Sequence, residues 1–502
     1  MQDNENLKIS LVKNMNKINL NLTLSIPIDS NANVKTVLSV DSYLLDCKAD
    51  CGAGKAIING KVGVKVVYVD TDNFTNSISS TQNFSETYLD NSITSDCYLN
   101  ISKYSIENNI LSSSGVLKIN CNITFSPVAY LNLGFNNSLS LDKSIITKIK
   151  EIQSYTIANI VDTQFENSNI IELPNNVSKI LSIQSCAVLE KATPSNNLIT
   201  LEGKIICNLL YEIQENDDAC QKFTCESFRL KTDIEQSAIS ESDLLDLCLC
   251  IDKTNDSFST ETENNTTLIT IKNNILVNGV SLRKIDIEIC DDLFCTTCDV
   301  EANKTKRDAT ILAENYNISE VVFNETTILA SEPAIDNIIA NLNINPEITN
   351  TYIKNGTVFM EGVISSNIIY VDENKAIQSK TIESPFVVNT KIEKANLDSF
   401  NSTISILDSK TKVKRGTIIE IEYSLFINMT IHTKSTIEII DNFKLGKPII
   451  NNFDYQIFIA KPNETIWDLA KRIKIAPTEL METNKNLPDI MTGGERVIIK
   501  RN

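Results

Sequence analysis

The 502-residue chain contains one histidine, one tryptophan, 14 glycines and 11 prolines. Ser-His-Asp and Cys-His catalysis both need a positioned histidine as the base, and His432 is the only histidine that could serve. Both kinds of catalysis are therefore disfavoured. No G-x-x-x-x-G-K-[ST] or G-x-G-x-x-G segment occurs, so no phosphate-binding loop is expected. The carboxylates show no spacing that marks an acid/base pair. The sequence therefore predicts a protein that is not an enzyme and needs no cofactor.

Positive charge is also scarce: 46 Lys and Arg face 64 Asp and Glu, for a net charge of −18. This balance argues against binding nucleic acid or anionic lipid, because both rely on basic residues. No run of about 18 apolar residues is present, so no membrane insertion is expected. The first ten residues lack a basic segment followed by an apolar one, which predicts a chain without a signal peptide that stays in the cytoplasm.

Thirteen cysteines, all before Val300, are interpreted as reduced thiols because a cytoplasmic chain rarely keeps disulfides. The only C-x-x-C is Cys295-Thr-Thr-Cys298, whereas structural zinc usually needs two such pairs. Asp291, Asp292 and Asp299 lie nearby and are expected to raise a thiol pKa, which disfavours redox chemistry. No metal site is predicted.

An internal repeat is the strongest signal in the body of the chain. The segments "INGKVGVKVVYVD" from Ile58, "LEGKIICNLLYE" from Leu201 and "MEGVISSNIIYVD" from Met360 align without a gap, each with a glycine eight residues before a tyrosine. Apolar residues alternate between the glycine and the tyrosine, which predicts a strand with one buried face. The glycines are interpreted as bulges or tight bends rather than ligand contacts, and the tyrosines as core residues rather than binding platforms.

The similarity extends to flanking segments, so each copy contains several strands. "VKTVLSVDSYLLD" (34–46) matches "VSKILSIQSCAVLE" (177–190), and alternating segments follow at 115–125, 280–289 and 417–431. Repeats this long are typical of whole domains. The predicted fold is mainly β, with three tandem β-rich domains at residues 1–160, 161–322 and 323–445, followed by a small domain at 446–502.

The small domain has the pattern β-α-α-β. Residues 455–460 alternate as a strand, and Thr465 with Asp468 forms a capping box that begins a helix. Ile466, Leu469, Ala470 and Ile473 make its apolar stripe, and Pro477 begins a second helix that buries Leu480 and ends near Asn484. Gly493–Gly494 then turns the chain into a strand at 496–500.

The three-copy pattern resembles the SPOCS-domain proteins of spore-forming clostridia, and the SipL-type family of spore-coat morphogenetic proteins in particular. The C-terminal pattern, with "Thr-x-Trp-Asp-Leu-Ala", "Leu-Met-x-x-Asn" and a glycine before the last strand, resembles a LysM module. LysM modules bind N-acetylglucosamine polymers between two loops. Carried onto this chain, the groove is lined by Pro462, Asn463, Glu464, Thr465, Ile466, Asn486, Leu487, Pro488, Asp489 and Ile490.

One departure from that pattern is Asn463-Glu464-Thr465, where LysM modules usually have Gly-Asp-Thr; losing the glycine restricts the backbone. In the SipL-type family the module is a protein-docking unit for the ATPase of the coat basement layer. The resemblance therefore implies a non-enzymatic scaffold at the forespore surface of the mother cell. Its partners would be that ATPase, other coat proteins and further copies of itself. The alternative is a peptidoglycan-binding protein of the cortex or wall. Trp467 is either an exposed anchor for the partner or part of the rim of the module's own core.

Overall fold

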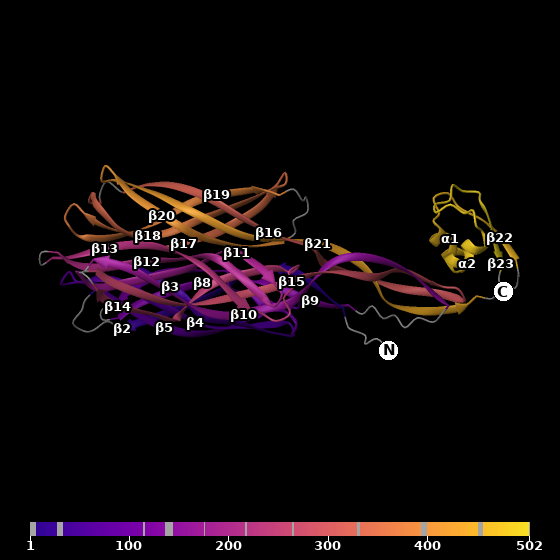
Figure 1. Cartoon of the computed structure of the whole chain (residues 1–502), viewed down its shortest axis with the longest axis horizontal. Helices are drawn as coiled ribbons and strands as arrows, with labels where there is room; N and C mark the ends of the chain where they lie inside the picture. Colours follow the sequence, from indigo (N-terminus) through magenta and orange to yellow (C-terminus); the bar gives the residue numbers. More distant parts are fainter. Residues whose placement is uncertain are drawn as a thin grey trace.

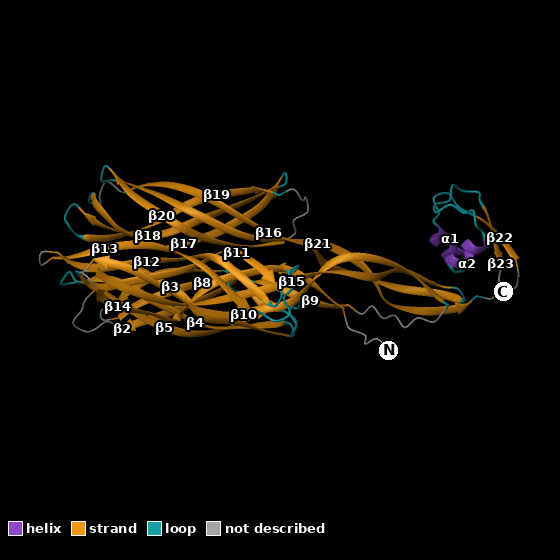
Figure 2. Ribbon diagram, in the orientation of Figure 1, coloured by secondary structure: helices purple, strands orange, loops and turns teal. Residues whose placement is uncertain are grey.

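The computed structural model describes residues 7–27, 34–113, 116–135, 144–174, 176–215, 218–263, 266–328, 332–392, 399–449 and 455–500. The chain is mainly β, with two short helices near its C-terminus, as predicted (Figure 2). An elongated body narrows into a stalk, and the C-terminal unit, residues 455–500, lies at the far end of that stalk (Figure 1).

Strand pairing groups the body into three copies, numbered here in chain order. Copy 1 (7–135) contains β1 (Leu7–Asn14), β2 (Ile18–Pro27), β3 (Val34–Gly52), β4 (Lys55–Asp70), β5 (Thr75–Leu89), β6 (Tyr98–Asn100), β7 (Tyr104–Ser113), β8 (Val116–Phe125) and β9 (Val128–Phe135). Copy 2 (145–295) contains β10 (Ile145–Pro174), β11 (Val177–Ser195), β12 (Leu198–Glu215), β13 (Asp218–Glu235), β14 (Leu244–Glu263) and β15 (Thr266–Cys295). Copy 3 (298–448) contains β16 (Cys298–Thr327), β17 (Ile335–Lys354), β18 (Thr357–Asp372), β19 (Ile377–Lys391), β20 (Ser399–Lys414) and β21 (Ile418–Pro448).

Each copy consists of a three-stranded antiparallel meander and a second antiparallel sheet. In copy 2 the meander is β11-β12-β13, and the first strand, β10, pairs with the last, β15, which also pairs with β14. Copy 3 repeats this arrangement with β17-β18-β19 and β16-β21-β20. In copy 1 the meander is β3-β4-β5, and the second sheet is interrupted into β1-β9-β6 and β2-β8-β7.

The boundaries predicted at 160/161, 322/323 and 445/446 fall inside β10, β16 and β21. The first strand of a copy pairs with the last strand of the same copy, so β10 belongs with β11–β15 and β16 with β17–β21. The division into independent domains stays a prediction.

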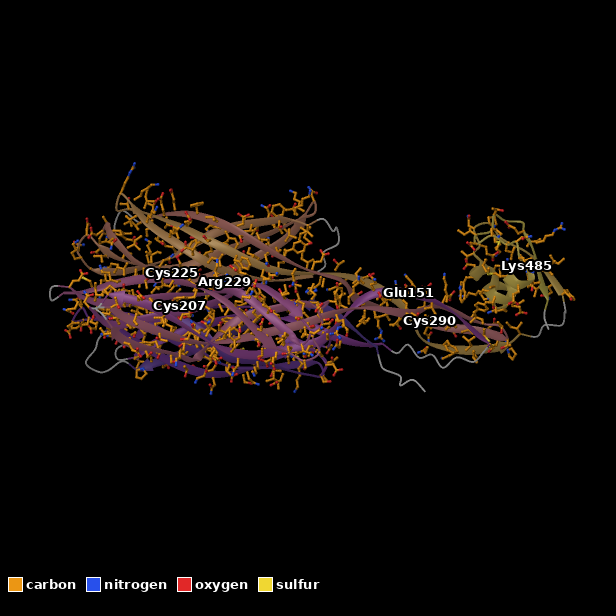
Figure 3. The ribbon with its side chains drawn as sticks, viewed as in Figure 1. Glu151, Cys207, Cys225, Arg229, Cys290 and Lys485 are labelled. Atoms are coloured by element: carbon orange, nitrogen blue, oxygen red, sulfur yellow. The ribbon has the colours of Figure 1, made fainter. Side chains whose placement is uncertain are left out.

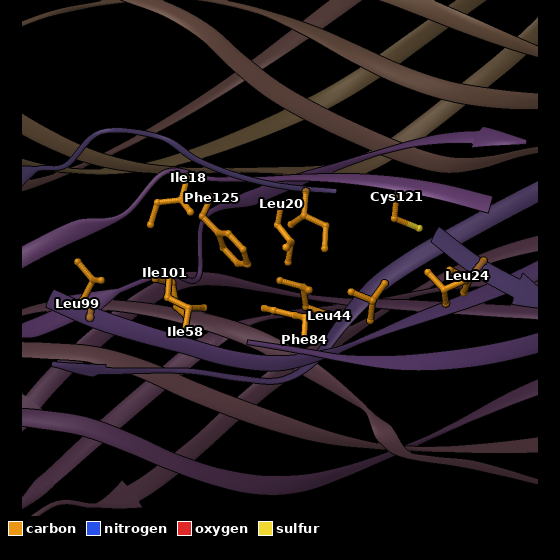
Figure 4. Close-up of a cluster of buried hydrophobic side chains, with 14 of the residues drawn as sticks. Ile18, Leu20, Leu24, Leu44, Ile58, Phe84, Leu99, Ile101, Cys121 and Phe125 are labelled. Atoms are coloured by element: carbon orange, nitrogen blue, oxygen red, sulfur yellow. The ribbon is translucent and has the colours of Figure 1, made fainter. Parts of the chain in front are cut away.

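The Gly–Tyr segment is the central strand of the meander in every copy, namely β4, β12 and β18. The predicted buried face is confirmed, since Val62, Val64 and Val66 and their counterparts in the other copies are buried, as are Tyr68, Tyr211 and Tyr370. In copy 1 these valines pack with Leu20, Phe84 and Phe125 into a core between the sheets (Figure 4).

The glycines lie opposite β-bulges, and the extra residue of each bulge is in the neighbouring strand rather than at the glycine itself. Gly203 pairs with Leu189 where β11 has a β-bulge, and Gly362 pairs with Ile348 beside a bulge in β17. A Cβ atom on Gly203 would lie 2.0 Å from the carbonyl oxygen of Val188. The neighbouring backbone therefore occupies the space that a side chain would need.

The three copies meet at an apolar hub. Two further bulges recur in β3, β11 and β17, and the second leaves Leu38, Leu181 and Ile339 unpaired at equivalent positions. These residues gather with the buried side chains of Val67, Leu210 and Ile369 from the three central strands. Polar contacts support the hub: Asn343 Nδ2 of copy 3 donates to Ser39 Oγ of copy 1 at 2.8 Å. The copies are thus joined by a shared apolar cluster at the hub, in addition to the core inside each copy.

The stalk consists of two paired ribbons. β14 pairs with β15 only up to Leu282, and β20 pairs with β21 only up to His432, so beyond these residues β10 with β15 and β16 with β21 continue as two-stranded ribbons. Ile287, Ile289 and Ile439 are among the buried residues between them. Figure 3 labels Glu151 and Cys290 on this stalk and Lys485 on the C-terminal unit.

Candidate functional site

The C-terminal unit has the predicted order of elements: β22 (Tyr455–Ile459), α1 (Ile466–Ile473), α2 (Pro477–Thr483) and β23 (Arg496–Lys500). The capping box of Thr465 and Asp468 is present in both directions. Leu469, Ala470 and Ile473 of the predicted stripe are buried, and α2 begins at Pro477 and buries Leu480. The local signals in the sequence were therefore sufficient to determine this unit.

The structure brings the two predicted loops together. Thr465 and Ile490 form a β-bridge, and the amide of Met491 donates to the carbonyl of Glu464 at 2.8 Å. The amide of Asn463 donates to the carbonyl of Met491, also at 2.8 Å. Among the predicted groove residues, the exposed ones are Pro462, Asn463, Asn486, Pro488, Asp489 and Ile490, and Thr465, Ile466 and Leu487 are half-buried. These loops thus form one continuous surface.

Glu464 is the exception among these residues, because its side chain is turned inward. Its carboxylate accepts hydrogen bonds from Arg472 Nε at 2.6 Å and from the amide of Lys461 at 2.9 Å. These bonds lower the pKa of Glu464, with the Arg472 contact contributing most. Glu464 therefore stabilises the first loop from the inside of the unit. Its side chain is not part of the exposed surface of the two loops.

Asn463 keeps the backbone conformation that the missing glycine would favour. Its φ angle is 62°, in the left-handed region, which asparagine tolerates better than most residues. Gly493 lies against this loop with φ of 100°, and a Cβ there would meet Pro462 Cγ at 2.7 Å. The departure from Gly-Asp-Thr therefore changes which side chain the loop carries more than it changes the path of the loop's backbone.

Trp467 contacts the stalk. Its Nε1 donates to Asp292 Oδ2 of β15 at 2.9 Å, and its ring meets Phe294 edge-on with centroids 5.2 Å apart. Lys471 Nζ lies 2.7 Å from both oxygens of Asp292, and Lys474 Nζ lies 3.6 Å from Asp299 Oδ1. Burial opposes ionisation of Asp292, but the bonds from Lys471 and Trp467 hold its pKa below the usual value. The half-buried Trp467 thus joins the unit to the rest of the chain.

Asp292→Ala is expected to weaken this docking by tenfold or more, since hydrogen bonds to charged groups contribute about 1.5–3 kcal/mol each. Trp467 is the only tryptophan, so its fluorescence reports on the contact directly. The emission is expected to move to longer wavelength as the indole enters water. Asp291→Ala is the matched control, because that carboxylate lies 4.0 Å from Lys148 on the stalk. An unchanged spectrum in Asp292→Ala would contradict this docking.

No family model, curated protein or solved structure matches the chain. In the described part of the chain, no helix is long and apolar enough to cross a membrane. The same residues contain no group of three or more His, Cys, Asp or Glu side chains placed to hold a metal ion.

A cavity of about 1550 Å³ lies between the three copies. Its lining includes nine Asp and Glu but only two lysines, Lys48 and Lys253. Lys253 Nζ lies 3.2 Å from Asp41 and 4.4 Å from the centre of the Tyr43 ring, so this lysine is held within the wall. An acidic lining opposes anionic ligands such as nucleotides. No local pattern in the sequence indicates this cavity, because its walls come from segments far apart in the chain.

A second three-way junction surrounds Asp246 of β14. Its carboxylate accepts hydrogen bonds from Tyr130 of copy 1 and from Thr430 of copy 3, the latter at 3.1 Å. His432 Nε2 lies 3.6 Å from the same carboxylate. Tyr130 and His432 are fully buried and Asp246 is 5% exposed. The only histidine of the chain is therefore placed inside the body, between the three copies.

Proposed function

We propose that the protein is a non-enzymatic scaffold whose C-terminal unit binds a partner protein through its two loops. The observation that carries the proposal is the position of these loops. They belong to a small unit at the far end of a stalk, and the stalk extends from the body formed by the three copies (Figure 1). In this shape the small surface formed by the loops is kept apart from the large surface of the body. The resemblance to SPOCS and LysM domains leads to the same proposal.

The chemistry of the loop surface supports a protein partner. Ile490 is 59% exposed, and Pro488 and Asp489 beside it are also exposed. Apolar side chains edged by polar ones are typical of protein interfaces. Trp467 is engaged with Asp292 and Phe294, and Glu464 with Arg472, so neither adds to this surface. A partner would therefore contact Ile490 and the backbone around it.

The proposed partner is the ATPase of the spore-coat basement layer, and the proposed location is the forespore surface in the mother cell. The body would add contacts to other coat proteins or to further copies of this chain. Several weak contacts on one assembling layer raise the effective concentration of each binding site. A scaffold of this kind needs no single tight interface.

Ile490→Lys is expected to weaken binding of the full-length protein to the coat ATPase by about tenfold or more, because it replaces the large exposed apolar side chain of the loop surface with a charge. Leu89→Lys is the matched control, since Leu89 is an apolar residue 74% exposed on the body. Binding is measured by surface plasmon resonance, in parallel with soluble muropeptides.

Loss of ATPase binding in Ile490→Lys alone would support docking through the loops. Binding to muropeptides without binding to the ATPase would overturn the proposal in favour of a wall- or cortex-binding protein. Equal ATPase binding by both variants would show that another surface of the chain is used.

A further inference from the structure

The Cys295–Cys298 turn joins copy 2 to copy 3 at the tip of the stalk. β15 ends at Cys295 and β16 begins at Cys298, with Thr296 and Thr297 between them. The sulfur of Cys295 accepts a hydrogen bond from the amide of Thr297 at 3.4 Å and lies 3.2 Å from Thr297 Oγ1. It also lies 3.6 Å from Ser144 Oγ. Both cysteines are free thiols.

These contacts give the two thiols different pKa values. Burial opposes ionisation of Cys295, but its hydrogen-bonding contacts with Thr297, Ser144 and Cys298 lower its pKa to about 6. The pKa of Cys298 is raised, mainly by its hydrogen bond to Cys295. The sequence-based expectation that the acidic neighbours raise the thiol pKa is therefore wrong for Cys295. Asp292 is neutralised by Lys471, and the hydrogen bonds to the sulfur outweigh the more distant charges.

We propose that Cys295 and Cys298 form a peroxide-reactive dithiol site, in which Cys295 is the nucleophile and Cys298 the resolving thiol. The Cys295 thiolate attacks one oxygen of hydrogen peroxide, the O–O bond breaks, and the hydroxide that leaves takes up a proton to become water. The sulfur of Cys298 then displaces the hydroxyl group of the Cys295 sulfenic acid, with loss of its proton, as a second water. In total, two thiols and one peroxide give one disulfide and two waters.

Access and position both bear on this chemistry. The side chain of Cys295 is buried and that of Cys298 is 9% exposed, so an oxidant reaches the Cys295 sulfur only when the turn opens. The amide of Ile449 donates to the carbonyl of Thr297 at 2.8 Å, so the segment leading to the C-terminal unit crosses the turn. Phe294, the residue before Cys295, holds the ring of Trp467. The site thus lies where the C-terminal unit is attached.

The test uses the full-length reduced protein, treated with hydrogen peroxide and digested for mass spectrometry. Wild type is expected to form the Cys295–Cys298 disulfide, and Cys298→Ser is expected to stop at a Cys295 sulfenic acid trapped by dimedone. Cys290→Ser is the matched control, because Cys290 is buried in the same cluster but its pKa is raised. The emission of Trp467 in each variant confirms that the stalk tip is intact.

The pH dependence adds a second readout. The oxidation rate should rise with the thiolate fraction as the pH passes about 6 and level off above 7, whereas an ordinary thiol continues to rise toward 8.5. Opening of the turn scales the rate at every pH and leaves this midpoint unchanged. A Cys295 that stays reduced under conditions that oxidise free cysteine completely at pH 8, or a rate that rises only near pH 8.5, would overturn the proposal.

Discussion

Asp246→Ala is expected to lower the free energy of unfolding by about 3–5 kcal/mol, the cost of removing one partner from a buried charged network. The substitution leaves Tyr130 and Thr430 without their acceptor and His432 without its carboxylate, and these three residues come from copies 1 and 3. Copy 2 would lose a buried polar contact with each of its two neighbours at once. Urea denaturation followed by far-UV circular dichroism measures the effect, because Trp467 reports only on the C-terminal unit and its contact with the stalk.

The control for this prediction is Asp336→Ala, which removes a solvent-exposed ion pair with Lys375 and is expected to change stability little. A pH titration provides a further check. Burial opposes ionisation of Asp246, but His432, Tyr130 and Thr430 hold its pKa below the usual value. A depressed carboxyl pKa contributes stability above about pH 4 that is lost as the pH falls through the lower folded value. An Asp246→Ala variant as stable as the control would contradict this role.

Gly203→Ala is expected to destabilise the chain by about 3 kcal/mol or more, because the added methyl group meets backbone rather than a movable side chain. A Cβ at this position lies 2.0 Å from the carbonyl oxygen of Val188, so β11 and β12 must separate at the bulge. The same strand carries Leu210 into the hub, so the disturbance reaches the other copies. Urea denaturation monitored by circular dichroism is again the measurement.

Gly52→Ala is the matched control for that substitution. Its nearest non-neighbouring atom would be 4.0 Å from the new Cβ, so the methyl group fits without movement. A Gly203→Ala protein that unfolds at the same urea concentration as Gly52→Ala would show that the bulge adapts, and that glycine is dispensable in the central strand.

Local patterns explain what could be predicted. The alternation around Gly60, Gly203 and Gly362 located three central strands and their buried faces, because a strand with one face in a core shows its period in the sequence. The capping box at Thr465 and the proline at 477 set the helix starts for the same local reason. The mainly β fold and the βααβ order are confirmed on this basis.

Contacts between distant segments explain the rest. The pairing of β10 with β15 joins residues more than 90 apart, which displaced the predicted boundaries into strands. The partner of Trp467 is Asp292, 175 residues earlier in the chain, and no periodicity connects them. In the sequence, nothing distinguishes Asp246 from the other acidic residues on strands. Its role depends on Tyr130 and His432, which only the assembled copies bring near.

The shared hub has a consequence for the synthesis of the chain. Asn343 is translated 304 residues after Ser39, to which it donates its hydrogen bond. At about 5–20 residues per second, the ribosome needs about 15–60 s to reach Asn343 after Ser39, and Ile369 of the hub follows later still. Until then the apolar side chain of Leu38, and that of Leu181 once it has been translated, lacks the third copy that covers it. A nascent chain of this protein is therefore expected to be a client of holding chaperones until β17 and β18 emerge.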